Sequence, residues 1–369
     1  MMNGNNYNNG KKSNTKFFSI LILSIFTLTF LTGCLGEPNN PKPSETINKS
    51  NGTSQPSVQI VLEQQKNQTS VTDKNKIHDA NDSNSVADGQ NRNVPEFVFT
   101  PEQRLGIYFI NIANGSSIHG NAILVKKGDF DMLIDAGSKE NTGKLIDFLT
   151  SKKIDDIDVL LSSNADPGNY GGLVQVAERF PVETFWHGPQ TDAKTDANVA
   201  YNDIIKILNE KAKKIEVVER GFGANYNGIM FSVLNPQPAR FEDANNDAVV
   251  LKIINGNTSV LLTSGIQTGA QGKLLNEIPD KLKADVTTAP YYGVGSGTSN
   301  INQYLSKIRP PIMILTGSND ESATAGGSRE PFRRQMKQYG VKSYEIYVNG
   351  TLELTSDGET YDIHNFVQN

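Results

Sequence analysis

The stretch Leu161-Ser-Ser-Asn-Ala-Asp-Pro-Gly-Asn-Tyr-Gly-Gly172 joins two segments of different periodicity. Before it, residues 157–161 form a short apolar run that is typical of a buried strand. After it, residues 171–180 carry apolar side chains at helical spacing. The stretch therefore ends a predicted strand and opens a predicted helix, as in an α/β fold.

Segments rich in β-branched and aromatic residues surround this stretch and indicate further strands. The other predicted strands are 106–112, 122–125, 132–135, 182–186, 229–234, 248–254, 259–263, 284–288, 312–316, 344–347, 352–355 and 361–363. The other predicted helices are 139–153, 198–211, a segment near Ala270, 300–308 and 330–339. Two β-rich blocks, each followed by strand–helix alternation, predict two sheets packed face to face with helices outside. We expect one four-layer αββα domain at 96–369, because no linker-like stretch divides these residues.

Residues 1–33 have the features of an export signal. Lys11, Lys12 and Lys16 precede an apolar run at 17–31, which is short for a membrane span but suits a signal peptide. The run ends in Leu31-Thr-Gly-Cys34, which resembles a lipobox. We expect Cys34 to carry lipid and to anchor the protein at the cell membrane, facing the extracytoplasmic side. The alternative is an uncleaved anchor helix with an incidental cysteine.

Residues 34–95 are predicted to be a disordered linker. From residue 35 to residue 95 the chain contains no Phe, Tyr or Trp, and it is rich in Asn, Ser and Pro. Such a segment cannot bury enough apolar area to offset the entropy lost on ordering. His78 lies here and is expected to be solvated.

Composition excludes several classes of function. The chain of 369 residues has 40 acidic and 35 basic side chains, a net charge of −5, which argues against nucleic acid as a partner. A single cysteine excludes an intramolecular disulfide and a thiolate-cluster metal site. The usual multi-histidine zinc centre is excluded by the small number of histidines, which are His78, His119, His187 and His364.

The opening stretch resembles the metal loop of the metallo-β-lactamase fold, H-x-H-x-D-H followed by x-G-G, in its ComEC-like branch. Six further segments resemble this branch in the right order. They are Tyr108-Phe-Ile-Asn-Ile-Ala-Asn-Gly-Ser116, Leu133-Ile-Asp-Ala-Gly137, Asn245-Asn-Asp-Ala-Val-Val-Leu251, Leu261-Leu-Thr-Ser-Gly265, Tyr291-Tyr-Gly-Val-Gly-Ser296 and the terminal stretch from Asn349-Gly-Thr to Ser356-Asp-Gly358. The resemblance covers nearly all of 105–363 and implies a metallo-β-lactamase-like αββα sandwich.

The resemblance also implies where metal ligands should lie, and most of them are missing. In register with H-x-H-x-D-H, the chain has Asn164, Asp166, Gly168 and Asn169. The family's bridging Asp falls on Gly265, and its later His pair falls on Tyr291 and Tyr292. Amides and neutral phenols are poor ligands for zinc or manganese. One carboxylate, Asp166, cannot hold two divalent ions and activate a water. We therefore expect no catalytic residues, no bound metal and no cofactor.

The same fold would gather several polar and aromatic residues at one cleft. The predicted lining consists of Asn164, Asp166, Asn169, Tyr170, Trp186, His187, Tyr291 and Tyr292. An aromatic floor suits sugars, bases or apolar ligands, but the same side chains could equally fill a disused cleft. We expect His187 to be a hydrogen-bonded pocket residue or a surface residue and not a metal ligand. Ser116 and His119 are too close on a turn to form a triad, and no G-x-S-x-G motif is present.

Two functions follow from this reading. The first is a membrane-anchored extracytoplasmic lipoprotein with a pseudoenzyme domain, which acts by binding an unknown ligand or protein partner. The alternative is a metal-dependent hydrolase, a phosphodiesterase or nuclease by family analogy, with oxygen ligands around Asp166. Metal analysis of the purified protein discriminates between them.

Overall fold

The computed structural model describes residues 103–112, 120–189, 196–241, 243–294, 301–317 and 329–367, all within a compact unit that spans Gly89–Asn369. The predicted export signal, Cys34, the predicted linker with His78, and the segment with His119 lie outside the described residues. Within the described ranges, no helix has the length and apolar character that a membrane span requires.

The first sheet has eight strands in the order β15-β14-β1-β2-β3-β4-β5-β6. These strands are β1 (Leu105–Phe109), β2 (Ile123–Lys127), β3 (Phe130–Ile134), β4 (Ile157–Ser162), β5 (Val182–His187), β6 (Lys214–Val217), β14 (Leu352–Ser356) and β15 (Tyr361–Asn365). Strands β3 to β6 run parallel, whereas the pairs on the other side of β3 are antiparallel. Parallel pairing places the carboxyl ends of β4 and β5 side by side at one edge.

The second sheet has seven strands in the order β13-β12-β11-β10-β9-β8-β7. These strands are β7 (Gly223–Tyr226), β8 (Ile229–Asn235), β9 (Val250–Asn255), β10 (Thr258–Leu262), β11 (Val286–Thr288), β12 (Ile312–Leu315) and β13 (Lys342–Glu345). Pairing is antiparallel from β7 to β10 and parallel from β10 to β13. A hairpin at Asn255-Gly256 joins β9 to β10, and Gly256 has the positive φ of 58° that this turn needs.

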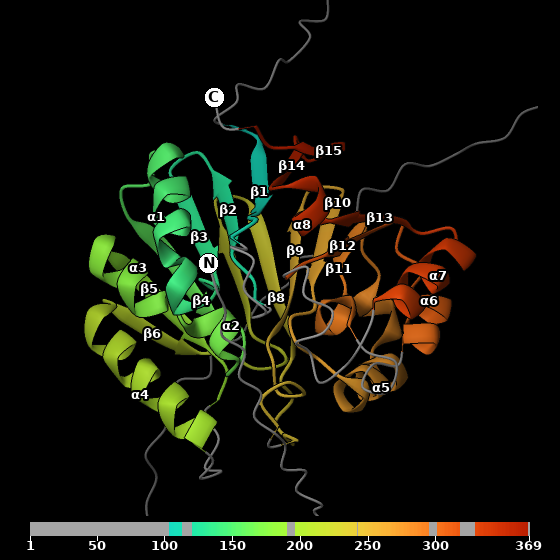
Figure 1. Cartoon of the computed structure of the whole chain (residues 1–369), viewed down its shortest axis with the longest axis horizontal. Helices are drawn as coiled ribbons and strands as arrows, with labels where there is room; N and C mark the ends of the chain where they lie inside the picture. The colour runs from blue at the N-terminus through green and yellow to red at the C-terminus, as the bar shows by residue number, and fades with distance from the viewer. Residues whose placement is uncertain are drawn as a thin grey trace, which may run out of the picture. The chain divides into compact units, whose positions relative to one another are not determined.

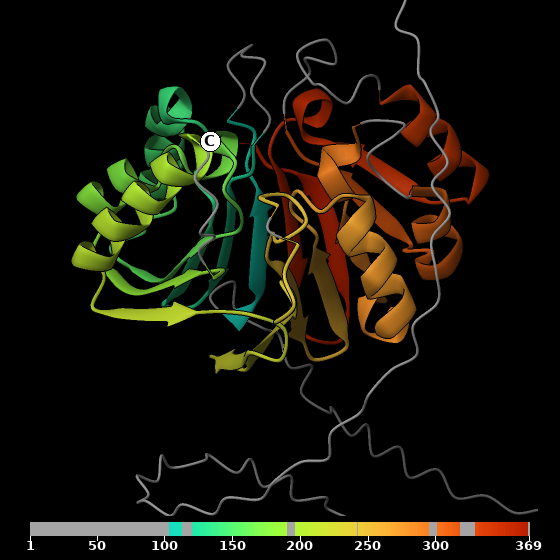
Figure 2. The same cartoon turned by 90° about the horizontal axis from the view of Figure 1, so that it is seen from below.

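Helices cover the outer face of each sheet, so that four layers result (Figures 1 and 2). The first sheet carries α1 (Thr142–Ser151), α2 (Pro167–Tyr170), α3 (Leu173–Arg179) and α4 (Asp196–Lys211). The second carries α5 (Thr268–Glu277), α6 (Ile301–Ile308) and α7 (Glu330–Gln338), and a short helix, α8 (Ile346–Asn349), follows β13. Buried apolar side chains form one core between the sheets and one core under each helical layer. The predicted αββα architecture is confirmed.

Alternation along β5 decides which side chains reach which layer. Phe185 packs in the core under the helices, whereas Trp186 packs in the core between the sheets. The Trp186 ring contacts Phe222 at 5.0 Å and Phe231 at 6.1 Å between ring centroids. Because successive strand residues point to opposite faces, His187 returns to the helical side.

The elements differ from the sequence prediction in three places. Strands β6 and β7 were not predicted, and the segment predicted as a strand at 344–347 leaves the sheet at Glu345 and forms α8. The predicted helix at 171–180 begins earlier, because Pro167 occupies the first helical turn of α2 and the side chain of Asp166 caps it.

Candidate functional site

The candidate site lies where the loop after β4 meets loops of the second sheet. Residues 163–166 follow β4, and they face the loop after β10, which contains Gly265, and the 3-10 helix Pro290–Gly293 (η4), which follows β11. All these loops leave the carboxyl ends of parallel strands, the usual position of a ligand site in an α/β protein.

Three neutral side chains form a buried hydrogen-bonded group, which we call the amide–phenol cluster: Asn164, Asn169 and Tyr292. The Nδ2 of Asn169 donates to Oδ1 of Asn164 at 2.7 Å and to the Tyr292 hydroxyl at 2.9 Å. The Oδ1 of Asn169 accepts from the backbone N–H of Asn121 at 2.9 Å. The exposed fractions are 4% for Asn164, 0% for Asn169 and 2% for Tyr292. Burial raises the pKa of Tyr292 well above its usual value, so that the phenol stays protonated at neutral pH.

Gly265 lies against this cluster and has no room for a side chain. A Cβ at Gly265 would lie 2.6 Å from Nδ2 of Asn164, 2.9 Å from Oδ1 of Asn245 and 3.5 Å from the Tyr292 hydroxyl. The position that the family resemblance assigns to a bridging carboxylate is therefore closed by neighbouring polar atoms.

Asp166 is partly exposed, and one of its oxygens is already engaged. Its Oδ1 accepts from the backbone N–H of Gly168 at 2.7 Å and caps α2. Burial raises the pKa of this carboxyl group. Among the residues that the structure describes, no group of three or more His, Cys, Asp or Glu side chains could hold a metal ion. Two mutually bonded amides, a neutral phenol and one capping carboxylate do not fit a dimetal centre.

The remaining predicted cleft residues lie at different depths. Tyr170 is buried against Tyr201 of α4, with ring centroids 5.2 Å apart. Tyr291 lies beside Tyr292, with ring centroids 5.9 Å apart, and is only partly buried. Both Tyr291 and Tyr292 have positive φ, at 49° and 57°.

The structure does not bring Trp186 and His187 into the amide–phenol cluster. Trp186 is 1% exposed in the core between the sheets, so that it cannot stack on a ligand in the cleft. His187 is 3% exposed, and its Nδ1 is 2.7 Å from the carbonyl of Gly188. Burial lowers the pKa of His187, and its Nε2 has no hydrogen-bond partner among the described residues. His187 is therefore a neutral, buried residue beside the site.

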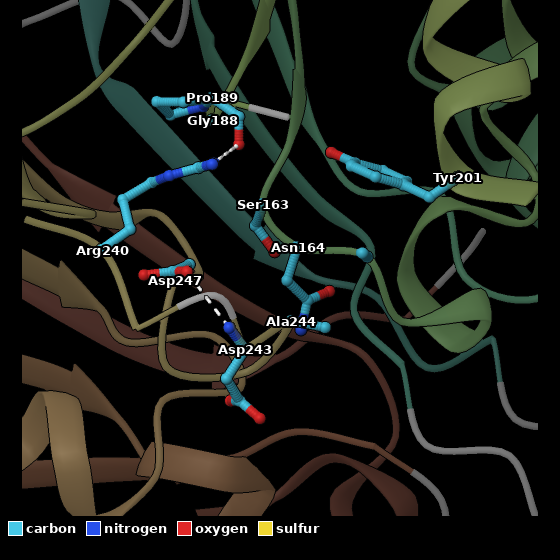
Figure 3. Close-up of a pocket in the computed structure, with 10 residues that line it drawn as sticks. Ser163, Asn164, Gly188, Pro189, Tyr201, Arg240, Asp243, Ala244 and Asp247 are labelled. Atoms are coloured by element: carbon cyan, nitrogen blue, oxygen red, sulfur yellow. Dashed lines mark hydrogen bonds between the residues drawn. The ribbon is translucent and has the colours of Figure 1, made fainter. Parts of the chain in front are cut away.

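A small pocket of about 30 Å³ lies beside the cluster (Figure 3), and we call it the Arg240 pocket. Its lining consists of Ser163, Asn164, Ala165, Gly188, Pro189, Tyr201, Arg240, Asp243, Ala244 and Asp247. The sequence prediction named only Asn164 of these residues. Arg240 lies in an irregular loop after β8, and no motif there signals a function.

The Arg240 side chain is oriented by the backbone. Its Nη1 donates to the carbonyl of Pro189 at 2.6 Å, and it forms no ion pair with another described residue. The carboxylate of Asp247 instead accepts from the backbone N–H groups of Phe241 at 2.8 Å and Asp243 at 3.2 Å. Figure 3 shows the Asp243 carboxylate turned away from the guanidinium group. The pocket therefore offers a partly buried cation that has no carboxylate partner among the described residues.

A buried acid lies deeper, at the end of β3. The backbone N–H of Ser163 donates to Oδ1 of Asp135 at 2.7 Å, and the Ser163 hydroxyl donates to Oδ2 at 2.6 Å. The oxygen of Ser163 is 2.7 Å from that of Ser264 in the second sheet. Burial raises the pKa of Asp135 to about 7. The sequence prediction used Asp135 only as part of a strand–Asp–Gly element.

Comparison with known proteins agrees with this architecture. Residues 118–218 match the family model of the metallo-beta-lactamase superfamily. The described domain is a metallo-β-lactamase fold domain.

Within this class, the chain is similar to ComEC-like proteins. It is 24% identical to ComE operon protein 3 of Bacillus subtilis over 212 residues, which are 57% of this chain and 26% of the relative. It is 21% identical to competence protein ComA of Neisseria gonorrhoeae over 131 residues, which are 35% of this chain and 18% of that protein. The chain thus spans only 16% to 26% of the length of the curated relatives it matches.

Among solved structures, the comparison finds the metallo-beta-lactamase fold protein YhfI from Bacillus subtilis. It has 13% sequence identity and a TM-score of 0.44, and the match covers 66% of this chain and 96% of that one.

Proposed function

We propose that the protein acts by binding a ligand or a protein partner and that its domain is a pseudoenzyme. The observation that carries this proposal is the amide–phenol cluster. Asn164, Asn169 and Tyr292 are buried, neutral and bonded to one another where the family resemblance places metal ligands.

The chemistry of a hydrolase of this fold depends on a metal-activated water. A bound divalent ion lowers the pKa of that water to about 7 and stabilises the charge of the transition state. The cluster offers no anionic donor, and Asp166 uses one carboxylate oxygen to cap α2. The described residues around Gly265 therefore do not provide the ligands that a metal-activated water requires.

The Arg240 pocket supports the binding half of the proposal. A guanidinium group without a carboxylate partner recognises carboxylate or phosphate oxygens through several N–H donors. A volume of about 30 Å³ suits one end group and not a whole drug-sized ligand. We propose that this pocket receives an oxyanionic group that a ligand or partner presents.

The location is part of the same proposal. The basic residues before the apolar run and the Leu31-Thr-Gly-Cys34 sequence support a lipid anchor at Cys34. The ligand or partner would then bind on the extracytoplasmic side of the cell membrane.

The catalytic half is tested with the full-length protein. Zinc, manganese or magnesium is added, metal content is measured, and phosphodiester, nucleic-acid and β-lactam substrates are assayed. We expect no stoichiometric metal and no turnover above background. Metal-dependent turnover that disappears in Asp166→Asn, a variant that keeps a capping side chain, would establish the hydrolase alternative.

The binding half is tested with two probes, inorganic phosphate and acetate, by thermal shift of the full-length protein. We expect one of them to stabilise the wild type and to lose this effect in Arg240→Met. The matched control is Arg220→Met, because Arg220 already forms an ion pair with Glu277 outside the pocket. Equal shifts in both variants would exclude the Arg240 pocket as the anion site.

A further inference from the structure

A second cavity lies between the two sheets, next to the amide–phenol cluster. Its volume is about 10 Å³, which is room for about one water molecule or one small ion. The polar part of its lining consists of Asn121, Asp135, Ser163, Ser264 and Thr288. All five residues are at most 6% exposed.

The hydroxyl protons of the two serines are already committed. The Ser163 hydroxyl donates to Oδ2 of Asp135 at 2.6 Å. Because that proton is used, the 2.7 Å contact between Ser163 and Ser264 requires Ser264 to donate. Both serine oxygens therefore have only lone pairs left to offer.

The hydroxyl proton of Thr288 is committed as well. The Thr263 hydroxyl donates to the carbonyl of Thr288 at 2.9 Å, and the two threonine hydroxyls are 3.1 Å apart. Thr288 must therefore donate to Thr263, and its oxygen also accepts from the Thr263 backbone N–H at 2.8 Å. The proton of Thr288 is not available to the cavity.

Asn121 adds an oxygen without a partner. Its side chain hydrogen-bonds to Asp135, and its Oδ1 has no partner among the described residues. With Asp135 as a carboxylate, the cavity is lined by hydrogen-bond acceptors and carries one negative charge. Asp135 is 0% exposed and forms no ion pair with another described residue, and an unpaired buried charge is strongly destabilising.

A water molecule in the cavity would satisfy the hydrogen-bond acceptors but not the buried negative charge. It could donate two protons to the lining, but it brings no charge. An oxygen-ligated cation satisfies both the lone pairs and the carboxylate. One carboxylate balances one positive charge.

We propose that this cavity is a binding site for a monovalent cation of the size of sodium, ligated by Asp135 and by neutral oxygens of Asn121, Ser264 and Thr288. The ion would neutralise the buried carboxylate and join the two sheets next to the amide–phenol cluster. The site is independent of the proposed function, because none of its four proposed ligands lines the Arg240 pocket or belongs to the amide–phenol cluster.

The test is thermal unfolding of the full-length protein at pH 8, with choline chloride replaced stepwise by sodium chloride at constant ionic strength. A ligand that binds only the folded state stabilises it in proportion to the logarithm of its concentration above its Kd. We expect Tm to rise by about 3 °C for each tenfold increase in sodium above that point. Equal Tm values in sodium and choline would overturn the proposal and leave a buried water as the occupant.

Variants separate this site from general salt effects. Asp135→Asn should abolish the sodium dependence, and Ser264→Ala, which keeps the charge, should shift it to higher sodium concentrations. The matched control is Asp131→Asn in β3, the strand that ends just before Asp135. Asp131 is buried but paired with Lys126 at 2.8 Å, and it does not line the cavity. A sodium effect that persists in Asp135→Asn would exclude the proposed ligands, and Ser264→Ala gives this test if Asp135→Asn does not fold.

Discussion

Gly265 can pack closely against the amide–phenol cluster because it lacks a side chain. Its backbone is not in the left-handed region, so a substitution there is opposed by contact alone. In Gly265→Ala, the added methyl group would meet Nδ2 of Asn164 at 2.6 Å. We expect the free energy of unfolding to fall by about 1–3 kcal/mol, as overpacking usually costs, measured by urea denaturation.

Gly272→Ala is the matched control for this substitution. Gly272 lies within α5, and nothing lies within 4 Å of its Cβ position. Alanine is favoured over glycine in a helix by about 0.5–1 kcal/mol, so this variant should be more stable than the wild type. Equal free energies of unfolding for Gly265→Ala and Gly272→Ala would contradict the prediction, because they would show that the side chains around Gly265 move aside without loss of stability.

Asp135 gives stability a defined dependence on pH in sodium-free buffer. Burial raises the pKa of the Asp135 carboxyl group from its ordinary value of 3.8 to about 7 in the folded protein. The folded state therefore keeps a proton that the unfolded state loses, and the free energy of unfolding falls as pH rises from about 4 to about 7. Asp131 acts in the same direction, because burial raises its pKa to about 6.

Asp135→Asn should make this curve flatter, above all near pH 7, where Asp131, with a pKa of about 6, contributes less to the slope. The measurement is urea denaturation at several pH values. An unchanged slope in the variant would mean that Asp135 is ionised in the folded state throughout this range.

The sequence predicted some of the site residues and not others, for physical reasons. Asn164, Asn169 and Tyr292 follow from the register of a recognised loop pattern. Trp186 was placed in the cleft because the alternation along β5 cannot be assigned to a face until the second sheet is present. Arg240 was missed, because its role depends on the Pro189 carbonyl, 51 residues away in the sequence.

At the scale of elements, the turn that carries Tyr291 and Tyr292 is held by one buried cation. The Nε of Arg329 donates to the Tyr292 carbonyl and its Nη2 donates to the Thr316 carbonyl, both at 3.2 Å. Arg329 is 1% exposed, and its guanidinium group lies 5.1 Å from the ring centre of Tyr347. It therefore joins the start of α7 to η4 and to the end of β12.

Arg329→Met should lower the free energy of unfolding by about 2–4 kcal/mol, because two buried carbonyl groups lose a charged donor. Arg333→Met on the same helix is the comparison. Arg333 pairs with both oxygens of Glu345 at 2.8 Å, but its side chain is 31% exposed, so about 1 kcal/mol or less is expected. A larger loss in Arg333→Met would contradict this order.

Most elements were predicted from periodicity, and the missed ones lack it. The side chains of Ile215 and Val217 in β6 are 41% and 54% exposed, so this edge strand shows no buried face. The apolar residues of 344–347 resemble a strand, but β13 is an edge strand and the chain turns into α8 after Glu345. Pairing at a sheet edge depends on the neighbouring strand more than on local pattern.

At the scale of the whole molecule, the proposed lipid anchor, Cys34, lies outside the described part of the chain. If Cys34 carries lipid, Cys34→Ser should move the protein from the membrane fraction to the soluble fraction or leave its precursor unprocessed. The measurement is fractionation followed by mass analysis of the N-terminus. A variant that fractionates and is processed like the wild type would contradict the lipid anchor.

The domain limits remain a prediction. The family model covers 118–218, whereas the paired strands extend from Leu105 to Asn365. The far end of the sequence belongs to the first sheet, because β14 pairs with β1 and β15 pairs with β14.

That arrangement has a mechanical consequence. β1 lies between β2 and β14, with five residue pairs to β14 and four to β2, all antiparallel. A pulling force on the chain before Leu105 acts along the axis of β1. It therefore loads the hydrogen bonds to β2 and to β14 together, in shear, and does not break them one after another. A domain held from its N-terminal side would thus transmit tension into the centre of a sheet, and the last strands of the chain would share the load with the first.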